Sequence, residues 1–186
     1  SKLKKLRGRI IKFNPKLVNS NRYITLLGDG SLGGKGRGLA FLSNFIENVY
    51  LKKLIPDLHV AIPKTAVIGM NEFDNFLENN NLYDVIFEDK EYNHVLEAFR
   101  TARLSEQLRN NLRKYLQVMT KPLAVRSSGL FEDSLNQPFA GVYSTYLLPN
   151  NHPDIERRLE DVENAIKLVF ASIYSPESRA YFNVID

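Results

Sequence analysis

Lys35 stands within an unusual run of glycines. Six of the chain's ten glycines lie between Gly28 and Gly38, in the stretch LGDGSLGGKGRGLAFL. Glycine lets a backbone approach a ligand closely and adopt positive φ angles, and a lysine near the beginning of a helix is typical of anion-binding sites. The stretch therefore predicts an anion-binding loop, although a flexible surface loop would have the same composition.

The glycine run matches no familiar phosphate motif in full. A P-loop is excluded because Asp29 and Gly36 stand where that motif requires a glycine and a serine or threonine. Gly28, Gly30 and Gly33 have the spacing of the dinucleotide fingerprint, but the acid that should end the next strand is missing. A protein-kinase glycine loop would need a valine that is also missing. These comparisons leave the anion unnamed.

A second group of reactive side chains lies in LAVRSSGLFEDSLNQPFAGVYSTY, and Arg126 is its centre. An arginine within an apolar strand needs a partner, and its planar guanidinium suits a phosphate. Gly141 allows a close backbone approach, and Thr145 supplies a hydroxyl. The alternative for Arg126 is a structural salt bridge with Glu132 or Asp133.

The periodicity of apolar residues predicts a mixed α+β fold without regular βαβ alternation. Strands are expected over residues 22–27, 59–68 (interrupted by Pro63), 123–128 and 140–148. Helices are expected from residue 36 to before Pro56, from an Asn71 cap to Leu77, twice within 89–119 with Ser105 capping the second, from Pro153 to Ile173, and after Ser175-Pro176.

Composition narrows the class of protein. A chain of 186 residues with 44% apolar and 25% charged residues is typical of a soluble globular domain. No apolar run approaches the roughly 18 residues that span a membrane, and the absence of cysteine fits a reducing cytoplasm. Residues 1–12 hold six basic residues and no acid. Residues 1–20 are therefore predicted to be a basic arm or linker; without interleaved aromatic residues, nucleic acid is an unlikely partner.

Four blocks carry a resemblance to a known family. They are GGKGRGLAFL, IPKTAVI, LAVRSSGLFEDSLNQPFAGVYSTYL and AIKLVFASIYSPESRAYF. Their order, spacing and residue types resemble the N-terminal nucleotide-binding domain shared by phosphoenolpyruvate synthase, pyruvate phosphate dikinase and rifampin phosphotransferase. The resemblance covers about residues 25–182.

The resemblance implies an ATP-grasp fold that holds ATP between two lobes. Residues 21–120 would form the first lobe and residues 121–186 the start of the second. Lys35 and Arg126 would contact the ATP phosphates, and Gly141 and Thr145 would help to hold the nucleotide. The family's magnesium ligands are expected beyond residue 186. One departure is SSGLFED, where the family usually has SSATAED.

The resemblance also implies a reaction for the whole enzyme. ATP would phosphorylate a histidine in a separate domain, and that histidine would pass the phosphoryl group to pyruvate. In sum, ATP, pyruvate and water would give phosphoenolpyruvate, AMP and phosphate. The full-length protein would be a cytoplasmic ATP-dependent phosphotransferase, and the chain alone would be inactive. Two alternatives stay open: a related dikinase with a glucan or rifampin acceptor, and a non-catalytic nucleotide-binding or interaction module. The oligomeric state is not predicted.

Overall fold

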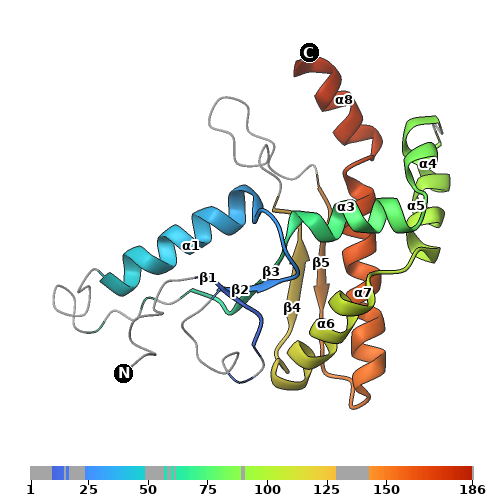
Figure 1. Cartoon of the computed structure of the whole chain (residues 1–186). Helices are drawn as coiled ribbons and strands as arrows, with labels where there is room; N and C mark the ends of the chain where they lie inside the picture. The colour runs from blue at the N-terminus through green and yellow to red at the C-terminus, as the bar shows by residue number, and fades with distance from the viewer. Residues whose placement is uncertain are drawn as a thin grey trace.

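A computed structural model of the chain combines two small sheets with seven helices in its described part (Figure 1). It describes residues 10–14, 16, 24–48, 57, 60, 62–88, 91–128 and 143–185. The strands are β1 (Ile10–Lys12), β2 (Ile24–Leu27), β3 (Thr65–Ile68), β4 (Leu123–Arg126) and β5 (Thr145–Leu148). The helices are α1 (Gly33–Asn48), α3 (Met70–Asn79), α4 (Tyr83–Glu88), α5 (Tyr92–Thr101), α6 (Glu106–Val118), α7 (Ile155–Ser172) and α8 (Pro176–Ile185). The mixture of helices and sheets agrees with the α+β class predicted from the sequence.

The first sheet is parallel, with strand order β1-β2-β3. Ile24 pairs with Ile10 on one side and with Thr65 on the other. Strand β1 was not predicted, because its three residues IIK lie inside the expected basic arm. Lys12 at its end forms a 2.7 Å ion pair with Asp29 of the glycine run. Residues 1–9 lie outside the described part, and the division of the chain into an arm and two lobes stays a prediction.

The strand expected over residues 59–68 is shorter than predicted. It begins at Thr65, after Pro63, and occupies one edge of the parallel sheet. Proline has no N–H group to donate to a neighbouring strand. The ladder can therefore start only beyond it.

The second sheet pairs β4 with β5 in antiparallel register, from Leu123 opposite Leu148 to Arg126 opposite Thr145. Alternate residues of this hairpin pack against the main core, among them Leu123, Val125 and Leu148. Figure 1 shows α7 on one side of the two strands and α1 on the other. The main core itself is formed by apolar side chains of α3, α5, α6 and α7 around Phe76, Phe99 and Leu159.

The helix ends test the predicted caps. Ser105 is the N-cap of α6, where its hydroxyl accepts a 3.1 Å bond from the amide of Leu108, as predicted. Ser175 likewise accepts from the amide of Ser178 at the start of α8. Asn71 as the cap of α3 was wrong: the N-cap is Gly69, which has no side chain to cap with. The α7 helix begins at Ile155 with Asp154 as its N-cap, so Pro153 is not its first residue.

Helix α1 differs from its prediction in where it begins, and part of its apolar surface is exposed. It starts at Gly33, three residues before the expected Gly36. Its apolar residues recur at helical spacing, yet Phe41 is 68% exposed and Phe45 51% exposed, with their rings stacked 6.4 Å apart. None of the helices in the described part is long and apolar enough to cross a membrane.

The turn between β5 and α7 depends on Asn150, which is buried and has a φ of 51°. Its side-chain amide donates 2.9 Å bonds to the carbonyls of Met119 and Lys121. Arg158 adds bonds to Met119 and to the Asn150 side-chain oxygen. These contacts close the carboxyl end of α6 and fix the start of β4.

We expect Asn150→Ala to lower the free energy of unfolding by about 2–4 kcal/mol. The substitution removes the bonds to the carbonyls of Met119 and Lys121, and alanine adopts the left-handed region less readily than asparagine. Urea denaturation of the variant and of Asn151→Ala measures this. The exposed neighbour should change stability by less than about 0.5 kcal/mol; equal effects of the two substitutions would contradict the assignment.

Candidate functional site

The segment between β2 and α1, residues 28–32, is here called the glycine loop. Gly28 and Gly30 within it, and Gly33 directly after it, have φ angles of 77°, 102° and 70°. Side chains rarely adopt this left-handed region, so glycine is required at all three positions for backbone geometry alone.

The glycine loop is packed tightly against the start of α3. A Cβ on Gly28 would collide with the side chain of Glu72, and one on Gly30 with Asn71. The loop's carbonyls also accept bonds from the first amides of α3: Ser31 from Met70 at 2.9 Å and Asp29 from Asn71 at 3.3 Å. The loop backbone therefore caps α3, which explains why that helix needs no side-chain cap.

Glu72 is a buried acid beneath the loop, 7% exposed, that sequence reasoning did not single out. Its carboxylate accepts a 2.9 Å bond from the hydroxyl of Ser105, the N-cap of α6. The glycine loop is thus supported by α3 and, through Glu72, by α6. No local sequence signal marks this role, because the acid resembles any other in the first turn of a helix.

Ser128 joins the two predicted motifs. Its hydroxyl accepts a 2.8 Å bond from the amide of Gly36 and donates a 2.7 Å bond to the carbonyl of Leu32. The backbone of Ser128 also lies so close to Gly33 that a Cβ there would collide with the Ser128 carbonyl. The first turn of α1 is therefore docked directly on the segment that follows β4.

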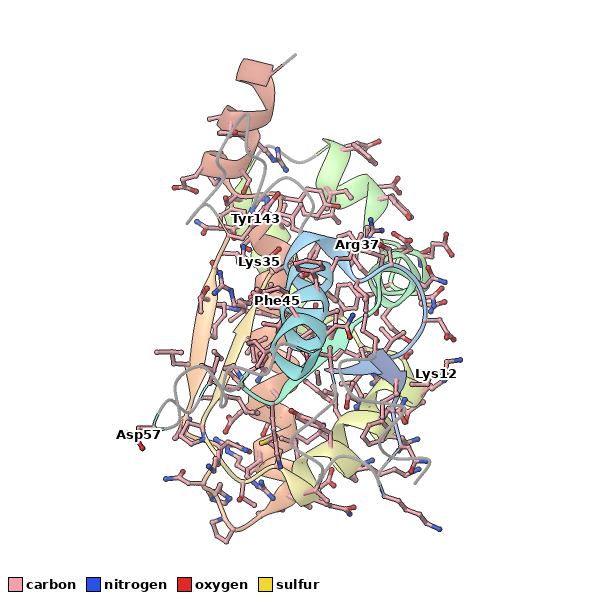
Figure 2. All side chains as sticks on the ribbon, turned by 90° about the vertical axis from the view of Figure 1, so that its left-hand side faces the viewer. Lys12, Lys35, Arg37, Phe45, Asp57 and Tyr143 are labelled. Carbon is pink, nitrogen blue, oxygen red and sulfur yellow. The ribbon has the colours of Figure 1, made fainter. Side chains whose placement is uncertain are left out.

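Lys35 lies in that first turn and is half-buried. In Figure 2 it projects from the side of α1 nearer β4 and β5, whereas Arg37 projects from the other side. Arg37 is exposed and donates a 2.9 Å bond to the Ser31 hydroxyl. The two basic residues of the glycine run therefore have different surroundings, and only Lys35 faces the hairpin.

Arg126 and Thr145 are paired across the hairpin. Both side chains are exposed, on the face opposite the one that packs on the core. Ser128 follows Arg126 by two residues, so an extended backbone would direct both side chains to the same face. The structure thus places the elements that carry Lys35, Arg126 and Thr145 next to one another.

The start of β5 is held by a hydrogen bond to the end of α7. The amide of Ser144 donates a 3.2 Å bond to the hydroxyl of Ser172 near the end of α7, and Tyr143 is 8% exposed. This contact fixes the backbone directly before Thr145. Gly141, Glu132 and Asp133 lie outside the described residues, so the nucleotide contact predicted for Gly141 and the salt bridge considered for Arg126 stay predictions.

A separate hollow of about 360 Å³ lies between the α5–α6 connection and α7. The 2.6 Å ion pair of Arg109 with Glu163 lines it, together with Lys167. Burial lowers the pKa of Lys167, whose ammonium donates to the carbonyl of Arg100 at the end of α5. These bonds tie helix ends together, and no predicted site residue lines the hollow.

Metal ligands are not grouped in the part of the chain that the structure describes. Within those residues, no cluster of three or more histidine, aspartate or glutamate side chains has a metal-binding arrangement. The magnesium ligands expected beyond residue 186 are a prediction that concerns other residues.

Comparison with protein families identifies the class of domain to which this arrangement belongs. Residues 29–184 match the model of the pyruvate phosphate dikinase AMP/ATP-binding domain. The chain therefore belongs to this family of nucleotide-binding domains, as the four sequence blocks indicated. Searches of the curated proteins and of the solved structures gave no match to the chain.

Two glycines of α1 give a matched test of the docking contact. We expect Gly33→Ala to destabilise the protein by at least about 2 kcal/mol, because the new Cβ meets the Ser128 carbonyl at a positive φ. Gly38→Ala should stabilise it by about 0.5–1 kcal/mol, since nothing lies within 4 Å of the added Cβ and alanine favours helix. Urea denaturation measures both, and effects of the same sign would refute the docking described above.

Proposed function

We propose that this chain is the ATP-binding part of a phosphoenolpyruvate synthase-like phosphotransferase with an ATP-grasp fold. The whole enzyme would convert ATP, pyruvate and water to phosphoenolpyruvate, AMP and phosphate through a phosphohistidine in another domain. The observation that carries the proposal is the Ser128 hydroxyl, which bonds Gly36 and Leu32 and so brings the helix of Lys35 to the strand of Arg126.

The site suits a polyphosphate because of its charge and its donors. Lys35 provides a positive charge in the first turn of a helix, where the helix dipole also favours an anion. Arg126 provides a planar guanidinium that can hold two phosphate oxygens at once. Thr145, opposite Arg126 in the hairpin, adds a hydroxyl. Gly141 would add a backbone amide at close approach.

Such groups catalyse phosphoryl transfer chiefly by position and charge. Negative charge is spread over the oxygens of the transferred group, and fixed cations stabilise it without having to reorganise. Mg²⁺, held by residues beyond 186, would supply further charge neutralisation. Lys35 and Arg126 would orient the phosphates toward the acceptor histidine.

Lys35→Ala and Arg126→Ala in the full-length protein should each lower kcat/KM for AMP formation by roughly 10²–10³-fold, as expected for the loss of one preorganised donor. Arg37→Ala is the matched control, because it removes a positive charge from the same helix turn on the side away from the hairpin. It should change kcat/KM by less than about threefold.

Thermal denaturation separates a ligand contact from a structural one. Arg126 is exposed, so its loss should change stability little if it contacts phosphate. A large drop in Tm with unchanged activity would instead support the salt bridge with Glu132 or Asp133.

Incubation of the full-length protein with ATP and with pyruvate, a glucan or rifampin identifies the acceptor. Nucleotide binding without formation of any phosphohistidine would contradict the proposed phosphotransferase and support a non-catalytic nucleotide-binding module.

A further inference from the structure

Three serines are buried where α7 ends and α8 begins. Ser172, Ser175 and Ser178 are 1%, 5% and 0% exposed. Serine is mostly a surface residue, and a buried hydroxyl costs free energy unless it is hydrogen-bonded. The Ser175 hydroxyl donates to the Ser178 hydroxyl at 3.0 Å, and the Ser178 hydroxyl donates to the carbonyl of Ser172 at 2.8 Å. These two hydroxyls join the start of α8 to the end of α7.

The hydroxyl of Ser172 reaches beyond this junction to the second sheet. It donates a 2.7 Å bond to the carbonyl of Val169 and accepts a 3.2 Å bond from the amide of Ser144. The donated bond fixes the rotation of the hydroxyl, and an oxygen lone pair is used for Ser144. An alanine would fill the same space in the helix, as the fully buried Ala171 does next to it, but it could not accept this bond.

The amide of Ser144 directly precedes Thr145, the first residue of β5. Thr145 stands opposite Arg126 in the register, and its side chain is exposed. A two-stranded sheet is marginal by itself, and the ends of such elements open most readily. Since α7 lies along one side of the hairpin (Figure 1), the bond from Ser144 to Ser172 holds this end of the hairpin against α7.

We propose that Ser172 is a positioning residue for the bound nucleotide. It holds the Thr145 hydroxyl at its place opposite Arg126 by accepting from the preceding amide, without contact with the ligand. A binding group has to be held closely in place, because a shift of about 1 Å is enough to lose its hydrogen bond. The inference rests on the proposed function, which assigns Thr145 to the nucleotide, and deepens it by adding a residue of α7.

Ser172→Ala and Ser178→Ala form a matched pair in the full-length protein. Each removes one buried hydroxyl, so both should lower Tm. Ser172→Ala alone should raise the KM for ATP in AMP formation, by about three- to tenfold, as expected for one neutral hydrogen bond to the ligand. Its kcat should change by less than about twofold, because Thr145 holds the nucleotide before and during the reaction. Assays well below both Tm values keep the variants folded.

Ser172→Thr keeps a hydroxyl at the same position. Its KM for ATP should stay within about twofold of the wild type, even if the added methyl group lowers Tm. A KM as high as that of Ser172→Ala would overturn the positioning role. An equal rise in KM for Ser172→Ala and Ser178→Ala would overturn it too, because any damage to the α7–α8 junction would then have the same effect.

A double-variant cycle separates this inference from the proposed function. In a Thr145→Ala background, Ser172→Ala should raise KM little further, because the hydroxyl that it positions is already absent. A full additional rise would overturn the positioning role and leave the nucleotide contact of Thr145 standing. Thr145→Ala with an unchanged KM would instead refute the contact proposed for Thr145, and the positioning role with it.

Discussion

The hydroxyl of Ser128 is the interaction on which the arrangement of the site depends. It accepts from Gly36 and donates to Leu32, and so uses both its donor and an acceptor position between segments more than ninety residues apart in sequence. Because both bonds fall at the start of α1, that helix is held against the segment that follows β4, and Lys35 is held with it.

Three glycines near Lys35 lie where another segment of the chain leaves no room for a side chain. Gly28 passes Glu72, Gly30 passes Asn71, and Gly33 passes Ser128, each too closely for a Cβ. Phosphate-binding fingerprints explain the spacing of glycines by contacts with the ligand, and none of these fingerprints matches the glycine run in full. The start of α3 and Ser128 determine the positions of these glycines at least as much as a ligand would. Both contacts come from distant segments, so the sequence of this stretch does not contain them.

Features with a local cause were predictable from the sequence, and features with a distant cause were not. Ser105 and Ser175 were identified as caps because a cap acts within its own helix turn. Strand β1 was missed because three residues of a basic segment become a strand only by pairing with β2. The family was predictable because its motifs recur in order, whereas the support of the glycine loop by Glu72 depends on an acid from another helix.

The β4–β5 hairpin shows why one face of a small sheet can remain exposed without destabilising the fold. A two-stranded sheet is marginal in water by itself, so its stability must come from the face that packs on the core through Leu123, Val125 and Leu148. The Ser144–Ser172 bond further ties β5 to α7. Because the core-facing side supplies the stabilising contacts, the residues on the exposed face need not pack against one another. The open face can therefore keep Arg126 and Thr145 exposed.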